Sequence, residues 1–156
     1  MPRRRPGALR AQPRDSRAWG DFVPVRIHGI STDSTLAILR LERLSDDYFV
    51  YPGATDRALR RYRAFLAPPG RRPLYPQYSE CGCRGCSFDD VRHARDVLDE
   101  VLRQLSSRPR AELRRQVVSL DAAYVRRTLP DPFAASRQWR SDLWWRRRLA
   151  GGREGE

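Results

Sequence analysis

One amphipathic pattern in the second half of the chain constrains the fold more than any other sequence feature. Between residues 88 and 105, apolar side chains recur every three or four positions, which places them on a single face of a helix. We expect this face to be directed at the core of the protein. Its members are Phe88, Val91, Ala94, Leu98, Val101, Leu102 and Leu105.

Two neighbouring segments share this helical spacing. The first follows a capping residue at Thr55 or Asp56 and ends before the pair Pro68-Pro69. The second begins near Pro109, ends near Pro130 and forms an antiparallel pair with the helix before it. Its apolar positions are Leu113, Val117, Leu120 and Tyr124.

A last helix is expected to begin at Asp131-Pro132 and to carry the aromatic residues near the end of the sequence. Before these helices, residues 22–30, 35–42 and 48–51 have the alternation or the β-branched and aromatic content of strands. The apolar run in 35–42 is also compatible with a helix. Short polar turns separate the three segments, which predicts an antiparallel meander.

The predicted fold class is therefore α+β: a small antiparallel β-meander followed by three to four helices and stabilised by a cysteine-rich metal clip. We expect a single domain over residues 21–149. Residues 1–20 are rich in Arg and Pro with little apolar surface, so they predict a disordered arm, and residues 150–156 a flexible tail.

All three cysteines lie within six residues, in the sequence Cys81-Gly82-Cys83-Arg84-Gly85-Cys86. An odd number of cysteines packed this closely argues against a disulfide framework. Thiolates and neutral imidazole are preferred zinc ligands, and three Cys with one His make a closed structural site. We therefore predict one structural Zn²⁺ ion held by Cys81, Cys83, Cys86 and His93.

Other assignments for the cysteines stay open. His93 faces away from the apolar stripe, so Asp89, Asp90, His28 or solvent are alternative fourth ligands. Three free thiols in a tight turn are the plain alternative to a metal site. Cys83 and Cys86 also form a Cys-x-x-Cys pair before a helix, which suggests thiol redox chemistry, but no strand-helix-strand pattern surrounds it. We expect no enzyme activity.

The net charge of +12 suggests a phosphate-binding surface, although all 31 basic residues are Arg and Asn is absent, as in a GC-biased genome. Arg is concentrated in the first 20 residues, in residues 57–80 and in the last third. We predict binding of nucleic acid as the main function. The predicted contact residues are Arg3, Arg4, Arg5, Arg60, Arg61, Arg63, Arg140, Trp144, Trp145, Arg146, Arg147 and Arg148.

The carboxy-terminal segment interleaves Trp with Arg, and indoles can stack on unpaired bases. The same pattern fits packing of the Trp side chains on the domain, or an anionic membrane surface. The main alternative function is an adaptor subunit that binds another protein through this Trp-bearing segment. No apolar run reaches the length of a membrane span or signal peptide, so a cytoplasmic location is expected.

Overall fold

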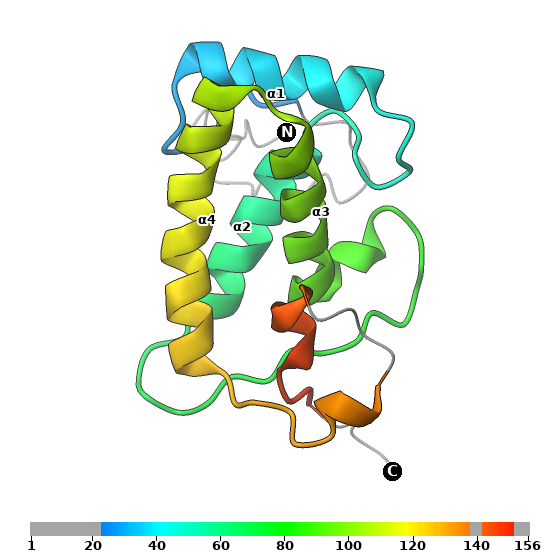
Figure 1. Ribbon diagram of the computed structural model, residues 1–156, viewed down its shortest axis with the longest axis vertical. Helices are drawn as coiled ribbons and strands as arrows, with labels where there is room; N and C mark the ends of the chain where they lie inside the picture. Colours follow the sequence, from blue (N-terminus) through cyan, green and yellow to red (C-terminus); the bar gives the residue numbers. More distant parts are fainter. Residues whose placement is uncertain (1–22, 138–141, 152–156) are drawn as a thin grey trace, which may run out of the picture.

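The computed structural model describes residues 23–137 and 142–151, and everything below concerns this part of the chain. Three helices lie side by side and a fourth crosses their ends (Figure 1). The crossing helix is α1 (Thr32–Leu44), and the other three are α2 (Ala54–Leu66), α3 (Val91–Gln104) and α4 (Ser107–Arg127). Three 3₁₀ turns complete the structure: η2 (Cys86–Asp89), η3 (Ala134–Ser136) and η4 (Trp144–Arg147).

The α+β prediction is wrong, because the described residues contain helices and no β-strand. The expected second strand is helix α1, whose buried residues Thr35, Ile38 and Glu42 recur at helical spacing. Ser31 caps this helix, with its Oγ accepting a hydrogen bond from the Ser34 N–H. The buried face includes Thr and Glu side chains, so an apolar count could not reveal it.

The other two expected strands are turns. Ile27 and Ile30 are both buried, because a turn closed by the Ile30 N–H and the Ile27 carbonyl brings them to the same side. Val25, which an alternating strand would bury with Ile27, is 90% exposed. A second turn between Asp47 and Val50 replaces the strand predicted at 48–51.

Helix α2 lies where the sequence predicted it, but its amino terminus is capped from outside. The preceding residue, Gly53, has a φ of 91°, a left-handed angle that suits glycine, and it has no side chain to offer as a cap. Glu42 of α1 supplies the missing acceptor: its carboxylate accepts hydrogen bonds from the N–H groups of Gly53 (2.8 Å) and Thr55 (2.7 Å). One buried carboxylate thereby joins α1 to α2.

Helices α3 and α4 form the expected antiparallel pair, but each begins at a different residue from the one predicted. Helix α3 begins at Val91 and not at Phe88, because Asp90 caps it by accepting a hydrogen bond from the Arg92 N–H. Helix α4 begins two residues earlier than expected, with Ser106 at its N-cap position. Pro109 lies in the first turn of α4, where a missing N–H donor leaves no helical bond unmade.

The helix predicted from Asp131 onward is wrong for the described residues of that segment, which form η3 and η4. The chain runs back antiparallel to itself, and the Asp131 N–H donates to the Arg147 carbonyl. This path brings Trp145 into the core, where it is 2% exposed. The free energy gained by burying this large indole favours the turned path over the helix that the spacing of the segment predicts. Helical spacing alone does not reveal this gain.

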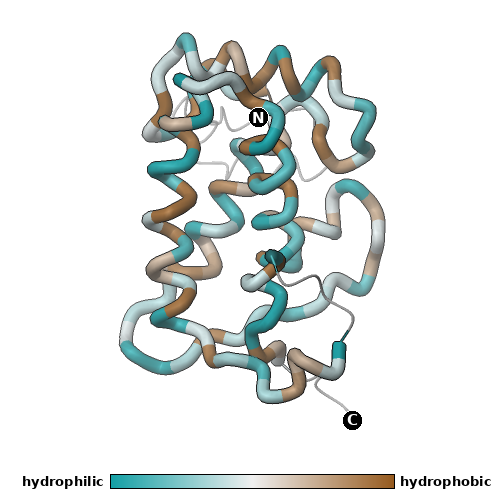
Figure 2. The backbone as a smooth tube through the Cα atoms, in the orientation of Figure 1, coloured by the Kyte–Doolittle hydropathy of each residue, from teal (hydrophilic) through white to brown (hydrophobic). Residues whose placement is uncertain are grey.

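A single apolar cluster joins all four helices and the η4 turn. Tyr62 of α2 and Tyr124 of α4 meet edge to face in it, and Trp144 of η4 lies against Tyr124. Hydrophobic residues nonetheless also occur on the outer side of α4 (Figure 2). None of the described helices is long and apolar enough to cross a membrane.

Candidate metal centre

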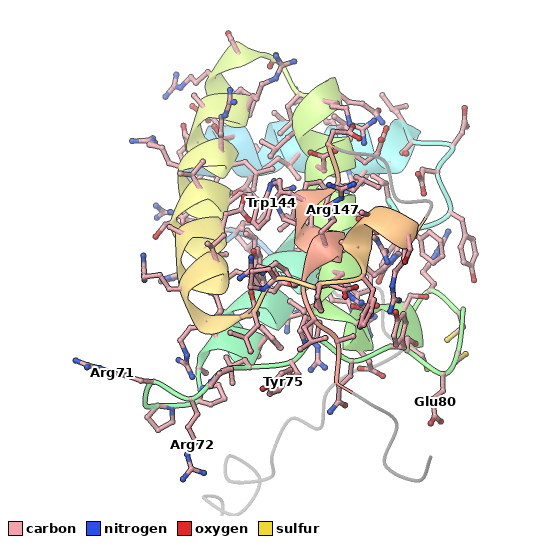
Figure 3. The ribbon with its side chains drawn as sticks, turned by 60° about the horizontal axis from the view of Figure 1, so that its bottom comes forward. Arg71, Arg72, Tyr75, Glu80, Trp144 and Arg147 are labelled. Atoms are coloured by element: carbon pink, nitrogen blue, oxygen red, sulfur yellow. The ribbon has the colours of Figure 1, made fainter. Side chains whose placement is uncertain are left out.

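The three cysteines lie together at the end of the long connection between α2 and α3. Their Sγ atoms all lie within 4.8 Å of one another, and all three are free thiols. Cys81 is exposed, while Cys83 and Cys86 are half-buried. Figure 3 shows the sulfur atoms gathered at the edge of the molecule, near the labelled Glu80.

Backbone groups within the loop point at the sulfur atoms. The Cys86 N–H donates to the Cys83 Sγ at 3.3 Å, and the Cys83 N–H donates to the Cys81 Sγ at 3.4 Å. Ser79 closes the loop from the other side, because its hydroxyl lies 2.7 Å from the Cys81 carbonyl and 2.8 Å from the Cys86 carbonyl. The backbone thus holds the thiols on one side of the turn before any ion binds.

Two arginines anchor the loop to the helical body. Arg57 of α2 donates to the Gly85 carbonyl at 3.1 Å. Arg84 donates to the Tyr48 carbonyl at 2.7 Å, and its guanidinium lies 4.7 Å from the ring centres of both Tyr48 and Tyr51. Neither arginine was among the residues predicted to form the metal site. The sequence shows Arg84 between two of the predicted ligand cysteines, but its partners Tyr48 and Tyr51 come from a distant turn.

The hydrogen bonds separate the acidities of two thiols. The hydrogen bond from the Cys86 N–H lowers the pKa of the Cys83 thiol to about 7. The hydrogen bond between the two side chains raises the pKa of the Cys86 thiol to about 11. Cys83 is therefore the thiol that first offers a thiolate near neutral pH, and an ion must displace the proton of Cys86.

The sulfur arrangement fits a tetrahedral ion. With Zn–S bonds of about 2.3 Å, two thiolates of a tetrahedral site lie about 3.8 Å apart. Sulfur atoms that are at most 4.8 Å apart therefore need to move together by about 1 Å or less. A Cβ built on Gly82 would meet no atom within 4 Å, so the backbone there has room for this movement.

His93 does not belong to the group of close donor atoms, and neither do His28, Asp89 and Asp90. The His93 ring packs edge to face against Phe49 at 4.4 Å and Phe88 at 5.2 Å between ring centres. Its Nε2 is buried without a hydrogen-bond partner among the described residues, and burial lowers the pKa of the imidazole. His93 thus lies between two aromatic side chains, where burial favours the neutral form of its ring.

The same histidine lines a cleft of about 410 Å³ between α3 and the turn that precedes α2. Phe49 and Leu143 form apolar parts of its wall, and Asp96 lies on the α3 side. Asp96 is already engaged, since it accepts a hydrogen bond from the Trp145 Nε1 at 2.7 Å and pairs with Arg146. Among the described residues that line the cleft, no three donor atoms lie close enough together to form a metal-binding group.

Most of the described residues predicted to bind nucleic acid have roles inside the protein. Trp145 is buried beneath the Arg95 guanidinium, which lies 4.1 Å from its ring centre. Arg148 donates from Nε to the Thr128 Oγ1 at 2.8 Å, and the Arg147 carbonyl accepts from the backbone of Asp131. Figure 3 shows Trp144 and Arg147 on the η4 turn.

On α2 each of the three predicted arginines likewise has a partner within the protein. Arg60 pairs with Asp56 at 2.9 Å, Arg61 donates to the Asp89 carbonyl, and Arg63 donates to the His28 carbonyl. The remaining predicted contacts, Arg3, Arg4, Arg5 and Arg140, lie outside the described residues. The described arginines of this prediction are thus engaged in contacts within the protein, and nucleic-acid binding by the predicted set stays a prediction.

No protein-family model, curated protein or solved structure matches this chain. The chemistry of its own residues must therefore carry any functional conclusion.

Proposed function

We propose that this chain is a non-enzymatic zinc-binding protein in which Cys81, Cys83 and Cys86 hold one Zn²⁺ ion. The observation that carries the proposal is the grouping of all three sulfur atoms within 4.8 Å, with backbone N–H groups directed at two of them. Thiolates are ligands that zinc prefers, and backbone donors stabilise the charge they carry.

The role proposed for the ion is structural. The connection from α2 to η2 contains no helix or strand, and its described backbone contacts to the body are few. One is the hydrogen bond from the Leu74 N–H to the Arg127 carbonyl, and another joins Gly151 to the Pro76 carbonyl. An ion bound to three thiolates would fix the end of this connection next to α3.

The proposal does not extend to nucleic acid. Two features support nucleic-acid binding. One is the net charge of +12, and the other is the presence of exposed arginines such as Arg71 and Arg72, which project from the connection between α2 and η2 (Figure 3). Against it, Trp145, Arg146 and Arg148 are occupied by contacts within the protein. Binding of nucleic acid stays a prediction from the composition.

Elemental analysis of the full chain tests the proposal. Protein purified without chelators and kept reduced with a phosphine should carry about one zinc per chain. Cys81→Ser, Cys83→Ser and Cys86→Ser should each remove most of the zinc, because each takes away one of three thiolates. His28→Gln, on an exposed residue outside the thiol group, is the matched control and should retain the metal.

Three results bear directly on the proposal. Folded, fully reduced protein that contains no zinc and takes up neither Zn²⁺ nor Co²⁺ would overturn it. A metal-free protein in which Cys83 and Cys86 form a disulfide in mild oxidant would favour thiol redox chemistry instead. His93→Gln tests the fourth ligand separately: unchanged zinc affinity would show that another group or water completes the shell.

A further inference from the structure

Helix α4 has two apolar faces. Leu113, Val117 and Tyr124 are buried against the other helices. On a second face, about 130° around the helix from the first, Val118 is 56% exposed and Val125 is 46% exposed. Ala111 and Ala122 are exposed on the same side, and Leu129 follows just beyond the helix end.

The exposed apolar residues form a continuous stripe. At about 100° per residue, Ala111, Val118, Ala122 and Val125 fall within a sector of about 60°. Their spacing of seven, four and three residues is the spacing by which one helix packs along another. We call this set, with Leu129, the α4 stripe.

The surface on either side of the α4 stripe is basic. Arg114, Arg115 and Arg126 are exposed and take part in no ion pair among the described residues. The two acidic residues of the helix are engaged by hydrogen bonds within the protein. Glu112 accepts hydrogen bonds from Ser31, and Asp121 accepts them from Tyr62 and Arg95.

We propose that the α4 stripe is the binding surface for an amphipathic helix of a partner protein, with an apolar face and acidic residues along its edges. The apolar spacing fits a helix, and the arginines fit carboxylates on its flanks. A second copy of this chain is a poor occupant, because pairing two α4 stripes would place Arg against Arg. Binding to the phosphates of nucleic acid would involve the arginines and would leave the exposed valines without an apolar partner.

The surface is already ordered in the free protein. Helix α4 has 21 residues, which is a length of about 32 Å, and its buried face packs on three other helices. A partner therefore does not have to order it on binding, which keeps the entropic cost of association low. Helix α4 lies on the opposite side of the molecule from the cysteine loop (Figure 1), so this inference is independent of the zinc site.

Fluorescence anisotropy with two synthetic peptides tests the proposal on the full chain. Each peptide is a 21-residue amphipathic helix, matched in length to α4, with Leu and Ala on one face. One carries Glu along both edges and the other carries Lys. The parent protein should bind the Glu peptide and not the Lys peptide, and salt should weaken the binding.

Surface variants locate the interaction. The double variant Val118→Glu with Val125→Glu should weaken binding of the Glu peptide at least about tenfold, because it places charge in the apolar stripe. Arg114→Glu with Arg115→Glu should reverse the preference in favour of the Lys peptide. Leu44→Glu, at an 83% exposed position on α1, is the matched control and should bind like the parent. Circular dichroism checks that each variant is folded.

Three outcomes would overturn the proposal. The first is a folded parent protein that does not bind the Glu peptide at millimolar concentration. The second is a dimer in sedimentation that Val118→Glu dissociates, which would make a second copy the occupant. The third is duplex DNA binding that depends on Arg114 and Arg115 but is unchanged by the valine variants, which would make the surface a phosphate-binding one.

Discussion

At the scale of single residues, Glu42 shows how one side chain connects two elements. It is 2% exposed, and its carboxylate accepts hydrogen bonds from two N–H groups at the start of α2. Burial raises the pKa of this carboxyl group, while the two backbone donors act in the opposite direction. Since Gly53 has no side chain to cap the helix, Glu42 is the acceptor on which the first turn of α2 depends.

We expect Glu42→Ala to lower the free energy of unfolding by at least about 2 kcal/mol, because it leaves two buried N–H groups without acceptors. Glu100→Ala removes an exposed ion pair with Arg103 and should cost less than about 1 kcal/mol. Urea denaturation of the three proteins measures both changes. Equal stabilities of the two variants would contradict the capping role.

The candidate metal site was partly predictable at this scale for a physical reason. Three thiols within six residues converge through local backbone geometry, so their spacing was enough to predict the group that the structure shows. The position of His93 depends on Phe49, which comes from a turn more than forty residues earlier. A spacing between ligands carries no information about such a distant packing partner.

At the scale of helices, Glu112 joins α4 to the start of α1. Its carboxylate oxygens accept hydrogen bonds from the Ser31 N–H at 2.8 Å and the Ser31 hydroxyl at 3.0 Å. These hydrogen bonds lower the pKa of the Glu112 carboxyl group below its usual value of 4.5. Because the folded state favours the ionised form, Glu112 stabilises the fold fully above pH 4.5 and loses this effect as pH falls through its folded pKa.

Glu112→Gln should therefore be less stable than the parent protein at pH 7, and the difference should shrink as pH falls below about 4.5. Urea denaturation of both proteins between pH 3 and pH 7 gives the difference directly. A difference that stays constant over this range would show that the ionised carboxylate has no special role in the α1 and α4 contact.

Helices α2, α3 and α4 were predictable because their buried positions are mainly apolar and follow the helical period. The segment that forms α1 was predicted as a strand with a helix as the alternative, because the unbroken apolar run Leu36, Ala37, Ile38 and Leu39 has no period that decides between them. The buried Thr35 and Glu42 that complete its inner face are polar and carry no hydrophobic signal.

At the scale of the whole molecule, the apolar core and the cysteine loop are largely separate. The core cluster is built from the four helices and nearby turns and contains no cysteine. The loop meets it through Arg57 and Arg84, which bind the carbonyls of Gly85 and Tyr48. A metal ion in the loop should therefore stabilise the fold without creating it.

We expect removal of zinc by a chelator to lower the melting temperature while the helical signal in far-ultraviolet circular dichroism is retained at 25 °C. Binding of an ion to the folded state alone adds to its stability, so returning zinc should restore the melting temperature. The chelated Cys83→Ser variant should melt like the chelated parent. Loss of the helical signal on chelation would mean that the ion is needed for folding, as in small zinc fingers.

The burial of Trp145 has a consequence for synthesis of the chain. This side chain occupies the core but follows all four helices in sequence, and the Tyr124 hydroxyl meets its carbonyl only after the chain has turned back. Because Trp145 leaves the ribosome after the helices that surround its site, the helices that have already emerged lack this side chain. Until Trp145 joins them they present an unfilled apolar site, which is the kind of surface that chaperones recognise.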